Sequence, residues 1–573
     1  MSLFTRKPLA ELQREAEAHT LKRVLGPMNL VSLGIGAIIG AGLFSLTGIA
    51  AAENAGPAIV LSFVVAAIGC AFAGLCYSEF ASMIPIAGSA YTYGYATMGE
   101  WLAWIIGWDL VLEYAVGAST VSISWSAYVV SLLHSMGVDL PAKLCAGPFE
   151  AIKLPDGTLI HGVINLPAVF IIVAISVLLM TGIKESARAN AVIVVIKITV
   201  VLVFIALGVW FIQRANYTPF IPPNQGEFGK FGWSGIMRAA GVIFFAYIGF
   251  DAVSTAAQES KRPQRDMPIG IIGSLIICTV LYVAFSAVLT GMVSYKELGG
   301  AAPVAVAIDR TPYDWLKGLV KFGIICGFTS VILVMLLGQS RVFFSMSRDG
   351  LVPRIFSDVH PKWQTPWRSN FVFMLFTSLF SAFAPISVVG QMTSIGTLLA
   401  FVIVCAGIMI MRRTQPDLPR PFKTPLVPWV PIGGILVCAA MMYSLGPDNW
   451  FRLIAWLVIG QIIFFSYGRG HSKLRPAGER GRFTLFDRVM AFGNAGFLVG
   501  GIVGFLLRPA APSGSQLAFN AVIARGSTLR DAALIETARA SFNTMMLGVV
   551  IGVAAGVLVG YLIFALRDRP ARR

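Results

Sequence analysis

Three ionisable side chains stand in the middle of long apolar stretches of the sequence. Glu113 lies in VLEYAVGAS, Lys197 in VVIKITVVL and Asp251 in YIGFDAVST. A charged side chain at the centre of a membrane helix costs about 2.5–3.5 kcal/mol on insertion scales, so such a residue faces a polar cavity, a partner or a transported ion. A carboxylate at such a place can carry a proton or bind a cation. These residues are therefore the first candidates for chemistry.

Glycines crowd the apolar stretch NLVSLGIGAIIGAGLFSLTGIAAA, residues 29–52. A glycine in a helix interior is about 1 kcal/mol less favourable than alanine, and an unsatisfied backbone group in lipid costs several kcal/mol more. A helix interrupted from Ile38 to Gly42, near the middle of the bilayer, is tolerated only where its backbone lines a polar cavity. The alternative is a close-packing face, because Gly36 and Gly40 have the spacing of Gly-xxx-Gly association.

A second interruption is expected in SGIMRAAGVIFFAYIGFDAVSTAAQ, residues 234–258. Gly241 and Gly249 weaken this helix, and a break near residues 245–249 leaves Asp251 as the N-cap of a new half-helix. A capping Asp in the middle of a membrane needs such a free helix start, which supports the break. A role as a proton relay is the alternative for Asp251.

Two interrupted helices offer complementary backbone groups to a small zwitterion. The N-terminus of a half-helix presents free N–H groups and the positive end of a dipole, which suit a carboxylate. The carbonyls freed at the other half-helix end can accept hydrogen bonds from an ammonium group. The two stretches are five spans apart and so cross the membrane in opposite directions, the arrangement of binding sites between inverted halves. An α-amino acid carries both charged groups on one carbon.

The elements that must hold these residues are membrane helices. The 573 residues are 56% hydrophobic and 13% charged, whereas a soluble domain has roughly 25% charged residues. The mean hydropathy is +0.77, and long apolar runs indicate that lipid is the solvent. We predict fourteen spans, at about 29–52, 57–80, 99–133, 163–182, 191–213, 234–257, 269–292, 318–340, 370–384, 388–411, 427–445, 450–468, 486–506 and 545–566.

Lys and Arg are distributed unequally between the two sides of this predicted bundle. With the N-terminus inside, the cytoplasmic segments hold 29 of the 44 Lys and Arg residues and the external segments hold 12. This positive-inside bias predicts that both termini are cytoplasmic. We expect a multi-pass protein of the plasma (inner) membrane. The net charge of +16 then reflects topology, and nucleic acid is not an expected partner.

The predicted organisation is all-α and integral to the membrane, in five parts. They are a cytoplasmic amphipathic N-terminal segment (1–28), helices 1–5 as a first inverted repeat (29–213), helices 6–10 as a second (214–411), helices 11 and 12 (412–468), and two further C-terminal helices with a cytoplasmic tail (469–573).

Several long motifs, in order along the chain, resemble a known family. GIGAIIGAGLFSLTG is similar to the first-helix signature of amino acid permeases of the APC superfamily. Four longer segments resemble the cationic amino acid transporter branch of that superfamily. They are LKRVLGPMNLVSLGIGAIIGAG, YSEFASMIPIAGSAYTYGYATMGEWLAWIIGWDLVLEY, IGFDAVSTAAQESKRPQRDMPIGII and GQSRVFFSMSRDGLVP. The resemblance runs from about residue 20 to about residue 425, and the last two spans resemble the fourteen-helix arrangement of that branch.

This resemblance implies a fold and a set of site residues. The fold is a LeuT-like five-plus-five inverted repeat with helices 1 and 6 broken, followed by four C-terminal helices. The substrate carboxylate would meet the backbone at Gly40, Ala41 and Gly42. The substrate ammonium would meet carbonyls near Ile38, Phe245, Ala246 and Ile248. Related members often carry Ser or Thr where this chain has Ala41, so any contact there must come from the backbone N–H.

Two of the intramembrane charges receive a coupling role. The ammonium of Lys197 would replace a bound sodium against the carbonyls of helix 1, and the resemblance supports this role, because proton-coupled members of the superfamily carry a Lys at the matching place. Snorkelling to the cytoplasmic interface is the alternative. Glu113 could contact a cationic substrate, carry a proton, or pair structurally with a Lys or Arg. Na⁺ is not expected to be required.

The resulting hypothesis is a secondary active transporter that takes up α-amino acids with protons by alternating access. The branch suggests cationic substrates, whereas the expected lining, Phe44, Phe245, Val334 and Met335, is apolar, so neutral and cationic substrates both stay open. The alternatives are a polyamine or organic-cation carrier and a membrane amino acid sensor. No enzyme motif is found, and no cofactor or metal is expected. The expected partners are an amino acid, protons and the bilayer, with a small membrane accessory subunit left open.

Overall fold

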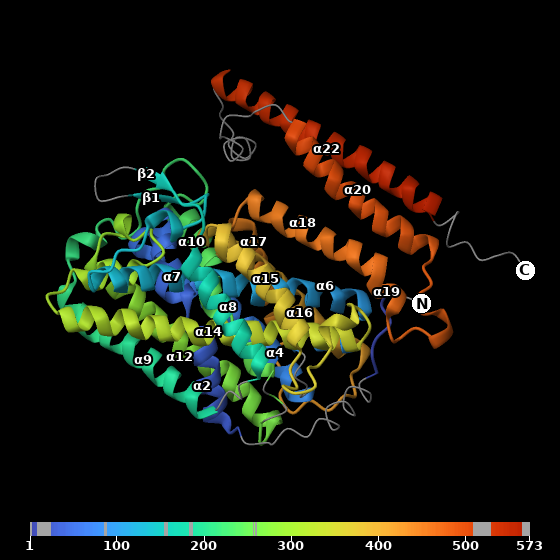
Figure 1. Ribbon diagram of the computed structural model, residues 1–573, viewed down its shortest axis with the longest axis horizontal. Coiled ribbons are helices and arrows are strands. Elements are labelled where there is room, and N and C mark those ends of the chain that lie inside the picture. The colour runs from blue at the N-terminus through green and yellow to red at the C-terminus, as the bar shows by residue number, and fades with distance from the viewer. Residues whose placement is uncertain are drawn as a thin grey trace, which may run out of the picture.

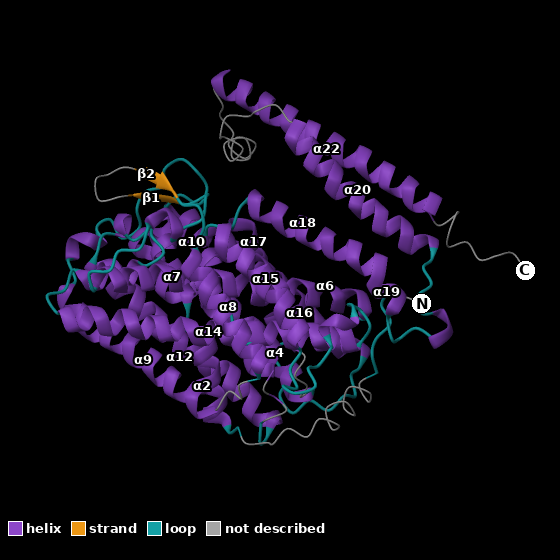
Figure 2. Cartoon of the chain, viewed as in Figure 1, coloured by secondary structure: helices purple, strands orange, loops and turns teal. Residues whose placement is uncertain are grey.

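The computed structural model describes residues 3–8, 25–84, 89–153, 159–182, 187–255, 257, 260–507 and 529–563. Most of these residues are helical (Figure 2). A short antiparallel hairpin of β1 (Ala151–Lys153) and β2 (Leu159–His161) lies in the connection after α7 (Gly117–Ser135). Helices satisfy their own backbone groups, which is why long apolar runs take this form in lipid.

The helices follow the predicted spans, so the spans keep their numbers. Span 1 contains α2 (Pro27–Ile38), η1 (Gly42–Leu46), α3 (Thr47–Ala50) and η2 (Ala51–Ala55). Span 2 is α4 (Ile59–Met83), and the short helix α5 (Ser89–Thr97) follows it. Span 3 consists of α6 (Glu100–Val111), η4 (Leu112–Val116) and α7 (Gly117–Ser135). Span 4 is α8 (Leu166–Thr181) and span 5 is α9 (Ala187–Gly208).

The second half repeats this order of elements. Span 6 contains α10 (Gly232–Ile243), η8 (Phe244–Tyr247) and α11 (Ala252–Thr255). Spans 7 to 10 are α12 (Pro263–Met292), α14 (Asp314–Arg348), α15 (Trp367–Phe383) and α16 (Ile386–Thr414), and α13 (Pro303–Asp309) lies between α12 and α14. The remaining helices are α17 (Trp429–Ser444), α18 (Pro447–Ile463), η12 (Phe464–Gly468), α19 (Arg469–His471), α20 (Leu485–Leu507) and α22 (Leu529–Ile563).

Helices at matching places in the two halves pack against each other. Helix α4 lies on α12, α7 on α14 and α8 on α15, and η1 of span 1 meets η8 of span 6. Each of these contacts joins an element of the first half to its counterpart in the second half. This is the pairing expected if a two-fold axis in the membrane plane relates the halves.

The length and hydropathy of the helices agree with a membrane protein. Eight described helices are long and apolar enough to cross a membrane, and four shorter apolar helices accompany them. Among the described residues, each predicted span range contains helix. The count of fourteen crossings stays a prediction.

Two parts of the chain differ from the expected layout or lie outside the description. Helix α22 begins at Leu529, well before the expected 545, because the polar stretch LRDAALIETARA continues the helix where hydropathy alone predicts a loop. The predicted N-terminal amphipathic helix falls mostly on residues 9–24, which are outside the described residues, and residues 3–8 form a turn and an extended stretch.

Helices α20 and α22 form a close pair beside α18 (Figure 1). Gly496 and Gly500 of α20 meet the carbonyls of Gly552 and Gly548 of α22 so closely that a Cβ at either position would overlap them. Small residues at four-residue spacing allow this approach of two backbones in lipid. Gly-xxx-Gly packing, the alternative considered for span 1, therefore occurs in the C-terminal pair.

Candidate functional site

The first broken helix is interrupted where its glycines are densest. Helix α2 ends at Ile38, and Ile39 leaves the helical region with φ −72° and ψ 106°. The chain resumes as a π-helical turn, η1, at Gly42. A helix start leaves its first N–H groups without partners in the same helix. The interval from Ile39 to Gly42 therefore lies at the place where a carboxylate was expected.

The second broken helix is interrupted at Ile248, after the short 3-10 turn η8 that follows α10. After η8, Ile248 is extended with ψ 135°, and Gly249 has φ +116°. Glycine suits this place for two reasons. A positive φ is rarely adopted by other residues, and a Cβ on Gly249 would lie 2.9 Å from the carbonyl carbon of Ala37. Helix α11 then starts at Ala252.

The two breaks meet in the core. A Cβ on Gly42 would overlap the backbone of Ala246, and a Cβ on Gly40 would lie 3.3 Å from the side chain of Val331 on α14. All of these groups are buried. Glycine at position 42 is therefore needed for the contact between the broken helices, whereas position 40 faces a side chain that can move.

Tyr282 of α12 joins the carbonyls of both broken helices. Its hydroxyl oxygen lies 3.0 Å from the carbonyl oxygen of Ile38 and 2.9 Å from that of Ala246. These are two of the carbonyls predicted to receive the substrate ammonium. A phenol has one proton to donate, so it can satisfy only one of the two at a time. The other carbonyl remains an acceptor at the meeting point of the breaks.

Aromatic side chains pack beside this region, after the break in span 1. Phe44 is 1% exposed and packs edge-on against Phe285 and Phe328. Tyr128 donates a hydrogen bond of 2.6 Å to the carbonyl of Phe44. The expected lining residues Phe245 and Met335 are also buried. The walls around the breaks are therefore largely apolar.

Lys197 points into the protein interior from α9. Its Nζ atom donates a hydrogen bond of 2.6 Å to the carbonyl oxygen of Gly36, in the last turn of α2. The side chain is 1% exposed, and its methylene groups lie against Gly327 of α14. This geometry differs from snorkelling, in which the ammonium reaches water. It is the contact with a helix 1 carbonyl that the coupling hypothesis requires.

Glu113 lies in the π-helical turn η4 and is 1% exposed. Its carboxylate lies beside Asp251 of span 6 and Thr397 of α16, with Asp109 one turn away on α6. Among the described residues, the charged groups that act on Glu113 are these carboxylates, and no Lys or Arg is one of them. Glu113 therefore does not form the structural pair with a Lys or Arg that was one alternative for it. A buried acid in a membrane span is a candidate carrier of a transported proton.

Asp251 directly precedes α11, the position of an N-cap. The backbone N–H of Ser254 bonds to the carbonyl of Asp251 at 2.8 Å. The Asp251 carboxylate also accepts a hydrogen bond of 3.0 Å from the hydroxyl of Tyr114, which lies in the same turn as Glu113. Asp251 therefore links the start of α11, the second half of span 6, to span 3.

The sequence was compared with known proteins. The family model described as amino acid permease matches residues 25–464, which is most of the chain. The chain belongs to the amino acid permease family. This permease is accordingly a membrane transporter and not an enzyme, and its matched region contains both broken helices, Lys197 and Glu113.

Curated relatives of the permease carry different substrate names. The branched-chain amino acid permease BcaP of Bacillus subtilis is 46% identical over 82% of this chain and 99% of its own length. The methylthioribose transporter of the same organism is 41% identical with the same coverage. Cationic amino acid transporter 4, vacuolar, of Arabidopsis thaliana is 34% identical over 73% of this chain and 68% of its own length.

Sequence reasoning missed several partners of the permease site. Tyr282 and Tyr114 were not singled out, because a tyrosine in an apolar run is an ordinary packing residue until its hydroxyl partner is known. Two buried ion pairs also join different parts of the bundle. Lys321 is 1% exposed and pairs with Asp309 at 2.8 Å. Glu79 is fully buried, and Arg412 binds it at 2.7 Å.

Proposed function

We propose that this permease takes up neutral α-amino acids together with protons, by secondary active transport. The observation that carries the proposal is the meeting of two broken helices, whose freed backbone groups are bridged by Tyr282. An uncharged peptide backbone that offers both N–H and C=O groups matches a zwitterion without placing a fixed charge in the membrane. The family and its relatives support amino acid transport.

The substrate backbone occupies the interval between the breaks. The carboxylate accepts hydrogen bonds from the N–H groups of Gly40, Ala41 and Gly42, at the positive end of the half-helix that starts there. The ammonium has three N–H donors, which it shares among the carbonyls of Ile38, Phe245, Ala246 and Ile248. When the ammonium arrives, it takes over a carbonyl to which the Tyr282 hydroxyl donates in the empty site.

The substrate side chain is apolar in this proposal. The walls formed by Phe44, Phe245 and Met335 are buried and carry no charge, and a relative at 46% identity is named for branched-chain amino acids. The relative named for methylthioribose and the plant relatives named for cationic amino acids supply the alternatives. A cationic side chain would need a carboxylate in these walls, and Phe44, Phe245 and Met335 supply none.

Proton coupling rests on two buried sites. The Lys197 ammonium bonds to the Gly36 carbonyl, where it takes the place of a sodium ion and makes Na⁺ unnecessary. Glu113, with Asp251 and Asp109 beside it, holds a proton that is released when span 6 moves relative to span 3. We further propose the plasma (inner) membrane as its location, with both termini in the cytoplasm.

Counterflow in proteoliposomes tests this function. Liposomes preloaded with isoleucine should accumulate labelled isoleucine, and valine and leucine should compete, whereas methylthioribose, arginine, lysine and putrescine should not. Uptake should rise with an inward proton gradient and should be the same in Na⁺ and K⁺ media. Strong binding of isoleucine without counterflow would indicate a sensor. If only putrescine, arginine or methylthioribose competes, that compound's class is the substrate class in place of neutral amino acids. A requirement for Na⁺ contradicts the role of Lys197.

A further inference from the structure

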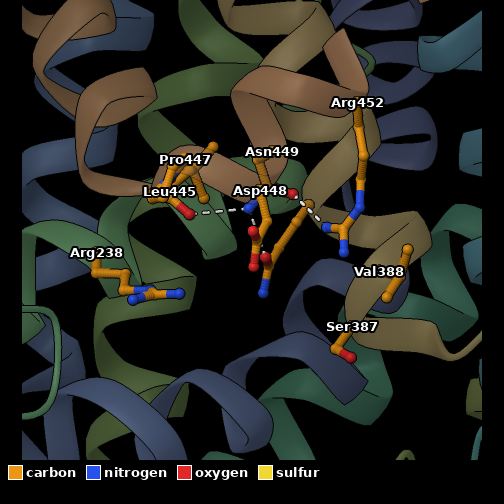
Figure 3. A pocket seen from close by; sticks show the side chains of 10 residues that line it. Arg238, Ser387, Val388, Leu445, Pro447, Asp448, Asn449 and Arg452 are labelled. Carbon is orange, nitrogen blue, oxygen red and sulfur yellow. Dashed lines mark hydrogen bonds between the residues drawn. The ribbon is translucent and has the colours of Figure 1, made fainter. Parts of the chain in front are cut away.

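A polar pocket lies away from the two breaks, beside Arg238 in the middle of α10. Its volume is about 90 Å³, and its walls come from α10, from the first turn of α16 and from the turn between α17 and α18 (Figure 3). One buried water needs roughly 10–15 Å³ by the same measure. The pocket therefore has room for a small solute or a lipid headgroup, and it shares no residue with the proposed substrate site.

Two guanidinium groups line this pocket. Arg238 enters it from α10 and Arg452 from α18 (Figure 3). Arg238 is half-buried, and among the described residues its guanidinium has no hydrogen bond or ion pair. Planar guanidinium donors suit the oxygens of a carboxylate or a phosphate. A cation held in this way is available to a ligand.

Two helices also begin at the pocket. Ser387 and Val388 are in the first turn of α16, and Pro447 is the first residue of α18. The start of a helix carries the positive end of a dipole, which attracts an anion. The N–H of Val388 is already bonded to the Pro385 carbonyl, and a proline has no N–H, so the two helix starts act here through their dipoles. Because two helix starts and two arginines line one cavity, the chemistry of the pocket favours an oxyanion.

One carboxylate stands in the same cavity. Asp448, in the first turn of α18, lies near Arg238 (Figure 3), but the two side chains form no ion pair. Glu53 and Glu227, which do not line the pocket, also act on the charge of Arg238. A negative group in the pocket repels ligands that carry only negative charge. It attracts a ligand whose oxyanion is joined to an ammonium group, because the ammonium can approach Asp448 while the oxyanion meets the arginines.

The pocket wall is held in place by its own hydrogen bonds. Asn449 donates to Gln391 at 2.7 Å and to the carbonyl of Leu445 at 2.8 Å, and its side-chain oxygen accepts from Arg452 at 2.8 Å. These bonds tie α16 to the turn before α18 and orient one of the two guanidinium groups. The ligand groups are therefore arranged before any ligand binds.

We propose that this pocket binds a small zwitterion in which an oxyanion is joined to an ammonium group. Two sources have this chemistry, namely the phosphoethanolamine headgroup of a lipid and a free α-amino acid. Tyr443 and Phe451, close to the pocket along the chain, are half exposed, as aromatic side chains are at a membrane interface. The proposal does not depend on the proposed transport function, because it concerns different residues.

Native mass spectrometry of the full chain in a neutral detergent tests the proposal for lipid. The probes are phosphatidylethanolamine, phosphatidylglycerol and phosphatidylcholine, the last having a quaternary nitrogen that donates no hydrogen bond. The wild type should bind one phosphatidylethanolamine at least tenfold more tightly than the others. Arg238→Gln should weaken this binding at least tenfold, whereas the control Arg214→Gln, at an exposed arginine outside the pocket, should not change it.

Asp448→Asn separates a zwitterion site from a plain anion site. This variant should lose the preference for phosphatidylethanolamine and should bind phosphatidylglycerol more tightly than the wild type does. For a free amino acid, equilibrium dialysis with labelled alanine should find one equivalent that Arg238→Gln removes while a second equivalent remains. If neither lipid nor alanine binding depends on Arg238, or if Asp448→Asn leaves unchanged the binding that does depend on Arg238, the proposal is overturned.

Discussion

The Lys197 ammonium donates a 2.6 Å hydrogen bond to the carbonyl of Gly36, one turn before the break in span 1. Lys197→Met keeps most of the side-chain volume but removes the donor. A buried carbonyl left without its partner costs about 1–3 kcal/mol, and this cost falls on the end of α2. We expect proton-driven uptake to fall at least tenfold, measured in proteoliposomes. The exposed control Lys473→Met should transport normally, and normal transport by Lys197→Met would contradict the coupling role.

Tyr282→Phe removes only the hydroxyl that bridges the Ile38 and Ala246 carbonyls. The empty protein should then unfold at a lower temperature, because a buried carbonyl loses its donor. A substrate ammonium restores that donor, so the rise in melting temperature caused by substrate should be larger in the variant than in the wild type. The measurement is thermal unfolding with and without isoleucine. Equal substrate-induced shifts would show that the ammonium does not use these carbonyls.

Gly42→Ala tests the contact between the broken helices. The added methyl group overlaps the backbone of Ala246, which cannot move aside without shifting span 6, whereas Gly26 has open space around it. Gly42→Ala should abolish uptake and lower the melting temperature by several degrees, and Gly26→Ala should do neither. Uptake assays together with thermal unfolding decide the matter. Full activity in Gly42→Ala would mean that the two breaks are further apart in the working protein.

Glu113→Gln removes one of the buried acids beside Asp251 and keeps its size. If Glu113 carries the transported proton, wild-type uptake rises as the external pH falls, and the variant should show a flat pH profile with counterflow preserved. Initial uptake rates between pH 5 and pH 8 provide the measurement. Glu479→Gln, at an exposed loop position, is the control and should keep the wild-type profile. An unchanged pH profile in Glu113→Gln would remove the coupling role from this residue.

Asp349 holds the N-terminal segment against the bundle. Lys7 binds its carboxylate at 2.8 Å and Tyr91 at 2.7 Å, and Lys7 is 5% exposed. Breaking a buried ion pair costs about 3–5 kcal/mol, so Asp349→Asn should lower the melting temperature clearly. The control Asp358→Asn breaks the exposed pair with Arg368. It should change the melting temperature little, because exposed ion pairs contribute about 0–1 kcal/mol to stability. Similar shifts for the two variants would mean that the N-terminal contact is weak.

Much of the architecture could be predicted from residue types and their order along the chain. Apolar runs placed the helices, and clustered glycines located the breaks near Gly40 and Gly249, because glycine in an apolar helix is costly unless the helix is interrupted. Hydropathy failed at α22, where a polar stretch is helical. The hydrogen bonds of a helix are local, so a helix can continue through a polar segment. Hydropathy does not mark such a segment as helical.

The sequence by itself determined that this chain is a helical membrane protein with two interrupted spans and three costly buried charges. Those features depend on local composition and on the free-energy cost of placing polar groups in lipid. The tertiary structure alone decided the partners: Lys197 with Gly36, Tyr282 with two carbonyls, and Glu113 with Asp251. Each of these contacts joins residues from different spans, and the distance between two spans depends on how the whole bundle packs.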